Sequence, residues 1–155
     1  MPHRVIEVKV KAILPTGGGC ALFIGNDEKI FYIHIDNFVG NSIAMYLRGG
    51  HTPRPLTHDL IGNLLLGFGA KIDRAIINEI RQGIFHARLI VSAENELLER
   101  KIVELDARSS DVIALAVRLE VPIFVTEEVW NEVENAAGLL EKIERGINPT
   151  EIIED

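Results

Sequence analysis

The segment Thr52–Leu60 limits most strongly how this chain can fold, because it contains two prolines. Pro53 and Pro55 hold φ near about −65° and push the residue before each of them toward extended geometry. A continuous helix or central strand therefore cannot pass through this point. Thr57 is then a suitable N-cap, since the apolar residues that follow recur at helical spacing as far as Phe68.

The chain before this segment is predicted to form strands and then one helix. Residues 4–14 alternate apolar and polar side chains, as a strand with one solvent-exposed face does. Two short strands over residues 20–24 and 30–35 would complete an antiparallel meander. Asp36 is a suitable N-cap for a helix that ends before Gly49.

The chain after this segment is predicted to alternate between strands and helices. Residues 71–81 are ambiguous, and their isoleucine content favours a strand. Residues 85–91 and 97–105 would form a second antiparallel pair across a turn at Glu94 and Asn95. The last elements are a helix over residues 112–119, a buried strand over 122–125, a helix capped by Thr126 and a helical pattern around residues 139–143.

These elements predict one compact α+β domain, with antiparallel strands and helices packed against the sheet. The length of 155 residues suits a single domain over residues 1–134, followed by an acidic helical appendage over residues 135–155. No apolar run reaches the length of a membrane span. The single cysteine, Cys20, excludes an internal disulfide, so a cytoplasmic protein is expected.

The charge is distributed unevenly along the chain. The formal net charge is −7, but residues 1–90 carry ten Lys and Arg against seven Asp and Glu, a balance of +3. Residues 91–155 carry six against sixteen, a balance of −10. A phosphate-bearing ligand is therefore compatible with the first part of the chain, whereas wrapping of a duplex on a continuous basic face is disfavoured.

Two expected junctions before helices concentrate the residue types that phosphodiester chemistry needs. In the first, Arg54 and Thr57 could bind phosphate, and His58 could act as a general acid or base. In the second, Arg108 and Ser110 offer further phosphate contacts. Three carboxylates complete the predicted catalytic set and could hold Mg²⁺ or Mn²⁺, namely Asp59, Asp106 and Asp111.

A structural role explains the same residues equally directly. Hydroxyl and carboxyl side chains at these positions are also what ordinary helix N-termini carry. Arginine and aspartate can pair simply to hold two elements together. His86 beside Arg88 is more typical of a solvent-exposed strand edge than of a ligand.

Four blocks of the sequence resemble the bifunctional nuclease domain family. They occur in the family's order and include an Arg-Pro-x-Thr-His-Asp motif and an Asp-Ala-Arg-x-Ser-Asp motif. The blocks are residues 53–60, 83–89, 106–116 and 122–125. The resemblance implies a prokaryotic cytoplasmic α+β domain with nuclease activity on DNA and RNA.

The family pattern falls on residues that the chemistry had already singled out. In the first motif these are Arg54, Thr57, His58 and Asp59, and in the second they are Asp106, Arg108, Ser110 and Asp111. Ser109 stands where proline is usual, which is expected to loosen the start of the helix slightly.

We therefore expect a nuclease that cleaves DNA or RNA, with a divalent metal as a possible cofactor. The alternative is a non-catalytic phosphate-binding or assembly module in which the Arg, His and Asp residues are structural. A homo-oligomer, at least a dimer, is also expected. The apolar faces of residues 129–133 and 139–143 exceed what a terminal segment needs for itself.

Overall fold

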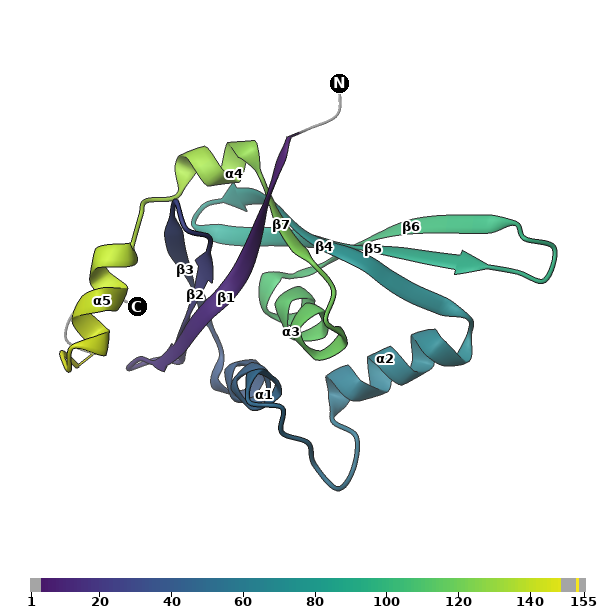
Figure 1. Cartoon of the computed structure of the whole chain (residues 1–155), viewed down its shortest axis with the longest axis horizontal. Coiled ribbons are helices and arrows are strands. Elements are labelled where there is room, and N and C mark those ends of the chain that lie inside the picture. Colours follow the sequence, from purple (N-terminus) through teal and green to yellow (C-terminus); the bar gives the residue numbers. More distant parts are fainter. Residues whose placement is uncertain (1–3, 149–152, 154–155) are drawn as a thin grey trace.

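The computed structural model describes residues 4–148 and residue 153. The strands are β1 (Val5–Pro15), β2 (Cys20–Gly25), β3 (Ile30–Ile35), β4 (Ala70–Arg81), β5 (Ile84–Glu94), β6 (Arg100–Arg108) and β7 (Ile123–Thr126). The helices are α1 (Asn37–Leu47), α2 (Thr57–Gly67), α3 (Ser109–Leu119), α4 (Glu127–Glu132) and α5 (Ala137–Glu144). Within the described residues the strands form one seven-stranded sheet in the order β3-β2-β1-β7-β4-β5-β6 (Figure 1), which confirms the α+β class.

The short strand β7 joins the two strand groups that the sequence predicts separately. It pairs antiparallel with β1, where Val5 lies opposite Thr126. It pairs parallel with β4, where Ala75 lies opposite Ile123. The chain reaches this central position from the edge strand β6 through the helix α3, so the neighbours of β7 are remote in sequence. The local pattern could not predict that the two groups form a single sheet.

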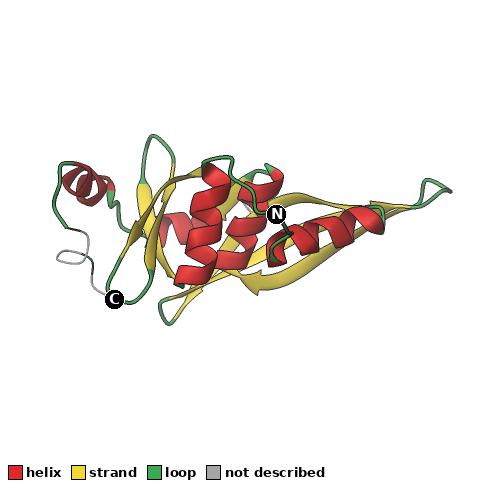
Figure 2. Ribbon diagram, turned by 90° about the horizontal axis from the view of Figure 1, so that it is seen from below, coloured by secondary structure: helices red, strands yellow, loops and turns green. Residues whose placement is uncertain are grey.

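The main core lies between the sheet and the helices α1, α2 and α3, which share one side of it (Figure 2). α3 is the central helix, and Val112, Ile113 and Ala116 expose at most 2% of their surface. α2 approaches α3 closely at Gly62, where an added Cβ would lie 3.2 Å from a methyl carbon of Leu119. This contact holds the middle of α2 against the C-terminal end of α3.

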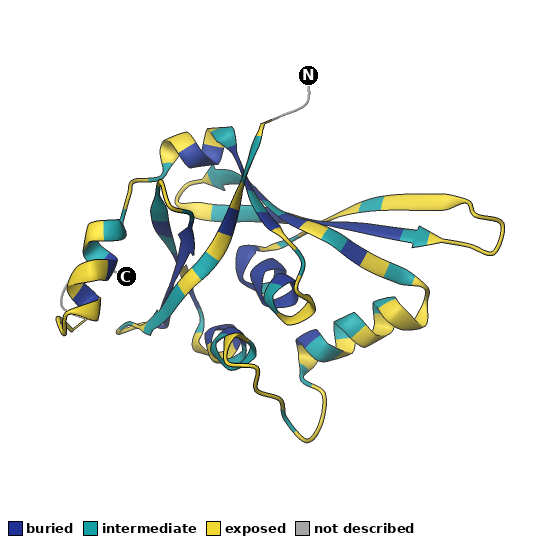
Figure 3. Cartoon of the chain, in the orientation of Figure 1, coloured by how far each residue is buried: buried dark blue, intermediate teal, exposed yellow. Residues whose placement is uncertain are grey.

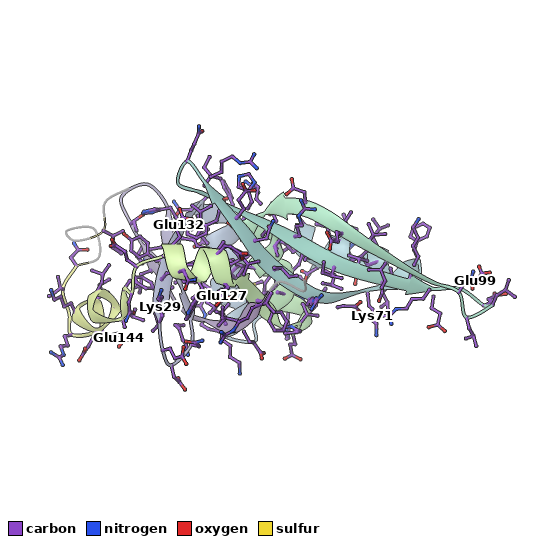
Figure 4. The ribbon with its side chains drawn as sticks, turned by 90° about the horizontal axis from the view of Figure 1, so that it is seen from above. Lys29, Lys71, Glu99, Glu127, Glu132 and Glu144 are labelled. Carbon is purple, nitrogen blue, oxygen red and sulfur yellow. The ribbon has the colours of Figure 1, made fainter. Side chains whose placement is uncertain are left out.

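The C-terminal helices are packed against the sheet. Lys29, just before β3, donates hydrogen bonds to carbonyl oxygens at the C-terminal end of α4, to Trp130 at 2.6 Å and to Val133 at 3.0 Å. Figure 4 shows this lysine beside the helix. In α5, Leu140 and Ile143 are buried in a second cluster with β2. The chain itself covers most of these apolar faces, so the unburied apolar surface on which the sequence predicted a subunit interface is small. Part of the predicted appendage, residues 149–152 and 154–155, lies outside the described residues.

Three boundaries differ from the sequence prediction. Leu56, rather than Thr57, is the N-cap of α2, and Thr57 is its first helical residue. The β5–β6 turn spans residues 95–99, because the Asn95 side chain accepts hydrogen bonds from two backbone amides of that turn. β6 continues to Arg108, so Asp106 lies within the strand and not in a loop. No helix in the described part of the chain is long and apolar enough to cross a membrane.

Candidate functional site

The two junctions predicted from the sequence meet at one aspartate. The Nε2 atom of His58, in the first turn of α2, lies 3.0 Å from Oδ1 of Asp111, in the first turn of α3. The Nε atom of Arg108 donates to the other oxygen, Oδ2, of Asp111 at 2.8 Å. Both oxygens of this carboxylate are therefore engaged, and they connect α2 with the end of β6.

The two partners of Asp111, His58 and Arg108, differ strongly in solvent exposure. The His58 side chain is 8% exposed, whereas the Arg108 side chain is 68% exposed. Asp36, the N-cap of α1, places Oδ2 3.8 Å from Nη1 of Arg108. The buried histidine and the aspartates thus orient an arginine whose outer edge is open to solvent.

A second ion pair holds α2 against the other end of α3. Arg118 donates from Nε to Oδ1 of Asp59 at 2.5 Å, and the Leu56 amide donates to Oδ2 at 2.9 Å. Asp111 and Arg118 are seven residues apart and lie on the same face of α3, which is why both reach α2. The guanidinium of Arg118 also lies 5.6 Å from the centre of the Tyr46 ring.

The pKa values of Asp59 and Asp111 lie below the ordinary value of 3.8. Burial alone would raise both pKa values. Hydrogen bonds from Arg118 and the Leu56 amide outweigh burial at Asp59, and those from Arg108 and His58 do so at Asp111. Both groups are therefore carboxylates at neutral pH. Burial, followed by the Asp59 charge, raises the pKa of Tyr46.

These lowered pKa values predict a loss of stability in acid. A carboxyl whose pKa is lower in the folded chain stabilises the fold above its unfolded pKa, and this contribution disappears as the pH falls through the folded pKa. We expect the free energy of unfolding to decrease as the pH is lowered below about 4. Urea unfolding of the wild type and an Asp59→Asn variant between about pH 7 and about pH 3 tests this, because the variant should lose less stability. Equal acid sensitivity in the two proteins would contradict the prediction.

A pocket of about 620 Å³ lies next to Arg108. It opens between β3 on one side and the β6–α3 junction on the other, with the β4–β5 turn contributing to its wall. β3 and β6 are the two edge strands of the sheet. The polar side chains that line it are Tyr32, His34, Asp36, His86, Asp106, Arg108, Ser109 and Ser110.

The pocket gives His86 a different setting from the one the sequence favoured. His86 lies directly opposite Arg108 in the β5–β6 register, so their side chains share one face of the sheet. His34 reaches the same pocket from β3. The sequence interpretation treated His86 as an exposed edge residue and His34 as background. The family block over residues 83–89 contains His86, but no local signal could place either histidine beside Arg108, since only the strand pairing and the meeting of the two edges bring them together.

The remaining predicted site residues are dispersed. Arg54 is exposed and makes no ion pair within the described residues, and Thr57 is exposed at the start of α2. Asp106 lies opposite Arg88 and lines the pocket, as does Ser110, which is 6% exposed. Asp59 faces Arg118 instead of Asp106 or Asp111. In the described part of the chain, no group of three or more His, Cys, Asp or Glu side chains is arranged to hold a metal ion.

The fold and this site define the chain as a single α+β domain with a pocket lined by arginine and histidine between its sheet edges. The chain belongs to the bifunctional nuclease domain family, whose sequence model matches residues 22–137. This match covers both junctions and the whole pocket, and it confirms the resemblance seen in the sequence motifs.

Two relatives from Mycobacterium tuberculosis are similar to this chain. They are uncharacterized proteins of the strains CDC 1551 and H37Rv, and each is 35% identical over 115 residues. The aligned region covers 74% of this chain and 63% of each relative. The chain therefore spans less than two thirds of the length of the curated relatives that it matches.

Proposed function

We propose that this protein hydrolyses phosphodiester bonds in DNA or RNA, with the pocket between β3 and β6 as its active site. The observation that carries the proposal is the placement of Arg108. Its side chain is mostly exposed, and a hydrogen bond from Nε to Asp111 fixes its orientation. It lines a pocket that His34 and His86 also line. Membership of a nuclease-named family supports the same activity.

In this proposal Arg108 binds the phosphate that is to be cleaved. Guanidinium groups bind phosphate through paired N–H donors, and such contacts stabilise the charge that develops in the transition state. Arg108 uses Nε for Asp111, and its Nη1 lies 3.8 Å from Oδ2 of Asp36, so its terminal nitrogens are the donors proposed to reach the substrate from the edge of this carboxylate pair. Ser109 and Ser110 begin an eleven-residue helix beside it, and the N-terminus of that helix adds a favourable field for an anion.

His86 is the proposed general acid or base. Hydrolysis requires one group to take a proton from the attacking water and one to protonate the leaving oxygen, while the P–O bond to the leaving group breaks. His86 lies across the strand pair from Arg108, and His34 lines the same pocket. The two imidazoles can share these roles, because an imidazole has two ring nitrogens, one of which can accept a proton while the other donates one.

The buried residues of the network have positioning roles in this proposal. His58 holds Asp111, Asp111 holds Arg108, and Asp59 attaches α2 to α3 through Arg118. The catalytic roles that the sequence suggested for His58, Asp59 and Asp111 stay predictions. Their contacts favour orientation of Arg108 over direct contact with the substrate.

A divalent cation would be held jointly by the protein and the substrate. Mg²⁺ typically uses one or two carboxylates together with phosphate oxygens and water, so a protein cluster of three ligands is not required. Asp106 lines the pocket and makes no side-chain ion pair within the described residues. With Asp36 on the opposite wall, it is the proposed contact for Mg²⁺ or Mn²⁺, which would polarise the phosphate.

The second candidate is a non-catalytic module that binds phosphate or supports assembly. The saturation of Asp59 and Asp111 by arginine and histidine favours it, because these contacts alone account for several residues of both motifs. Cleavage is the feature that separates the candidates.

We also place the protein in the cytoplasm, since its single cysteine is free and buried.

Cleavage of labelled single-stranded DNA and RNA oligonucleotides, with and without chelator, tests the proposed function. We expect His86→Ala to reduce the cleavage rate by about 10²- to 10⁴-fold, the usual contribution of a general acid or base, with little change in oligonucleotide binding. His51→Ala is the matched control, because His51 is exposed in the loop after α1. Wild-type protein that binds but does not cleave would support the non-catalytic module. Equal cleavage by the wild type and His86→Ala would remove the assigned role of His86.

A further inference from the structure

The pocket has an aromatic wall on the β3 side, across from the junction that carries Arg108. Tyr32 and His34 are two residues apart on β3, so their side chains lie on one face of the strand. Their rings are close to perpendicular, at 89°, and the ring centroids are 5.4 Å apart. Ile84, the first residue of β5, adds an apolar side chain that is 63% exposed. An arginine and an aromatic wall therefore line the same pocket.

The sheet holds this wall in place from behind. Tyr32 lies opposite the fully buried Phe23 in the β2–β3 register, with the two ring centroids 5.5 Å apart. Phe85, which also lines the pocket, stacks on Phe31 of β3 with centroids 5.7 Å apart. A side chain that is already packed in this way loses little conformational freedom when it binds a ligand. The wall is therefore preorganised.

Both sides of the pocket are open to solvent because they belong to the two edges of the sheet. β3 ends the sheet on one side and β6 ends it on the other. Figure 3 shows that β6 is exposed along most of its length, and His34 is exposed on β3. The pocket volume of about 620 Å³ lies within the range of roughly 300–1,000 Å³ that is usual for small-ligand sites. This size suits a nucleotide unit and is too small to enclose a double helix.

The charges of the pocket do not suit a double helix either. Among the described residues that line it, Arg108 is the only lysine or arginine, and Asp36 and Asp106 contribute two carboxylates. Duplex binding relies on many lysine and arginine contacts along the phosphate backbone. One arginine beside two carboxylates can hold one phosphate, so further affinity must come from contacts with the base.

We propose that the wall of Tyr32 and His34 binds the base of an unpaired nucleotide whose phosphate is held by Arg108, so that the substrate is single-stranded nucleic acid. This inference rests on the proposed function, because it assigns the substrate class of the same pocket. A base can stack on a protein side chain only where it is unstacked from its neighbours, as in single strands and loops. Such stacking is tolerant of sequence, because every base has a π-face. The protein therefore selects unpaired strands with little preference for sequence.

Fluorescence anisotropy, with chelator and again with Mg²⁺, tests the inference on the wild-type protein. The probes are a labelled single-stranded DNA oligonucleotide, the same strand annealed to its complement, and an abasic strand of equal length that keeps the phosphates. We expect the single strand to bind about 5- to 150-fold more tightly than the other two probes, the gain that stacking of one base supplies. Equal affinity for the single strand and the abasic strand, or tighter binding of the duplex, would overturn the inference. Failure of the single strand to bind at about 100 μM protein in either condition would also overturn it.

The variant Tyr32→Leu tests whether the aromatic ring supplies this affinity. Leucine keeps an apolar side chain against Phe23 but removes the ring. We expect binding of the single strand to weaken by about 5- to 150-fold and binding of the abasic strand to stay unchanged, because the abasic strand uses only phosphate contacts. Phe68→Leu is the matched control, since Phe68 is 82% exposed at the end of α2 and does not line the pocket. Unchanged binding of the single strand, or equal weakening of both strands, would overturn the role of the wall, and thermal melts establish that both variants are folded.

The outcomes for this inference and for the nuclease function are distinguishable. Base-dependent binding without cleavage would support the aromatic wall and contradict the nuclease. Cleavage by a protein that binds the single strand and the abasic strand equally would support the nuclease and overturn the aromatic wall.

Discussion

Replacing Arg108 with alanine is expected to reduce nucleic-acid cleavage by at least about a hundredfold, because removal of one preorganised donor to the transition state typically costs 10²–10³ in rate. Arg108 is the solvent-exposed member of a hydrogen-bond series in which Asp111 contacts both the buried His58 and Arg108. The variant removes the charge that faces the pocket and leaves the His58–Asp111 contact in place. Initial rates on a labelled oligonucleotide measure the effect.

Two further variants determine whether this effect is specific. Arg108→Lys keeps the charge but not the paired donors of the guanidinium, so we expect only partial activity from it. Arg100→Ala is the matched control, because Arg100 contacts Asp73 on the long β4–β5–β6 arm, away from the pocket. Full activity of Arg108→Ala would exclude this arginine from the site, and equal losses in Arg108→Ala and Arg100→Ala would point to general binding of the polyanion.

Replacing Arg118 with alanine is expected to lower the free energy of unfolding by about 2–3 kcal/mol. The variant leaves the Asp59 carboxylate, only 13% exposed, without its main partner, and uncompensated buried charges of this kind cost about 3–5 kcal/mol. We take a smaller value because the Arg118 side chain is 46% exposed and water screens part of the interaction. Urea denaturation at neutral pH measures the change.

A second substitution at Asp59 checks the assigned cause. If the buried charge is responsible, Arg118→Ala combined with Asp59→Asn should be more stable than Arg118→Ala alone. Arg145→Ala provides the control, since Arg145 and Glu141 form an ion pair that is 75% and 60% exposed and should contribute little. A loss in Arg145→Ala as large as that in Arg118→Ala would contradict the argument from burial.

Together the two predictions distinguish an arginine of the proposed active site from an arginine that stabilises the fold. Arg108 faces the pocket and should affect cleavage more than stability. Arg118 lies at the opposite end of α3 and should affect stability first. A large loss of stability with no loss of rate per folded molecule in both variants would assign Arg108, like Arg118, a structural role.

The amino-acid sequence by itself determined the local elements and the identity of the residues near the site. The Asp36 carboxylate accepts from the Val39 amide at 2.9 Å, as expected of an N-cap, and Gly69 after α2 has φ of +70°. Residues 71–81, ambiguous by periodicity, form part of β4, as their composition favoured. These outcomes depend on side chains and backbone groups a few residues apart, so a local pattern contains the necessary information.

Only the tertiary structure decided which of these residues face one another. Asp59 was expected beside Asp106 and Asp111, but it pairs with Arg118, 59 residues away. His86 lies opposite Arg108 because of the register in which β5 and β6 pair. The strand β7 lies between β1 and β4 because α3 carries the chain from the edge strand β6 to the centre of the sheet. Such contacts depend on how whole elements pack, and neither periodicity nor capping preference encodes that packing. The motifs therefore identify the polar residues that matter, while the packing of α2 and the sheet on α3 determines whether each residue holds the fold or faces the pocket.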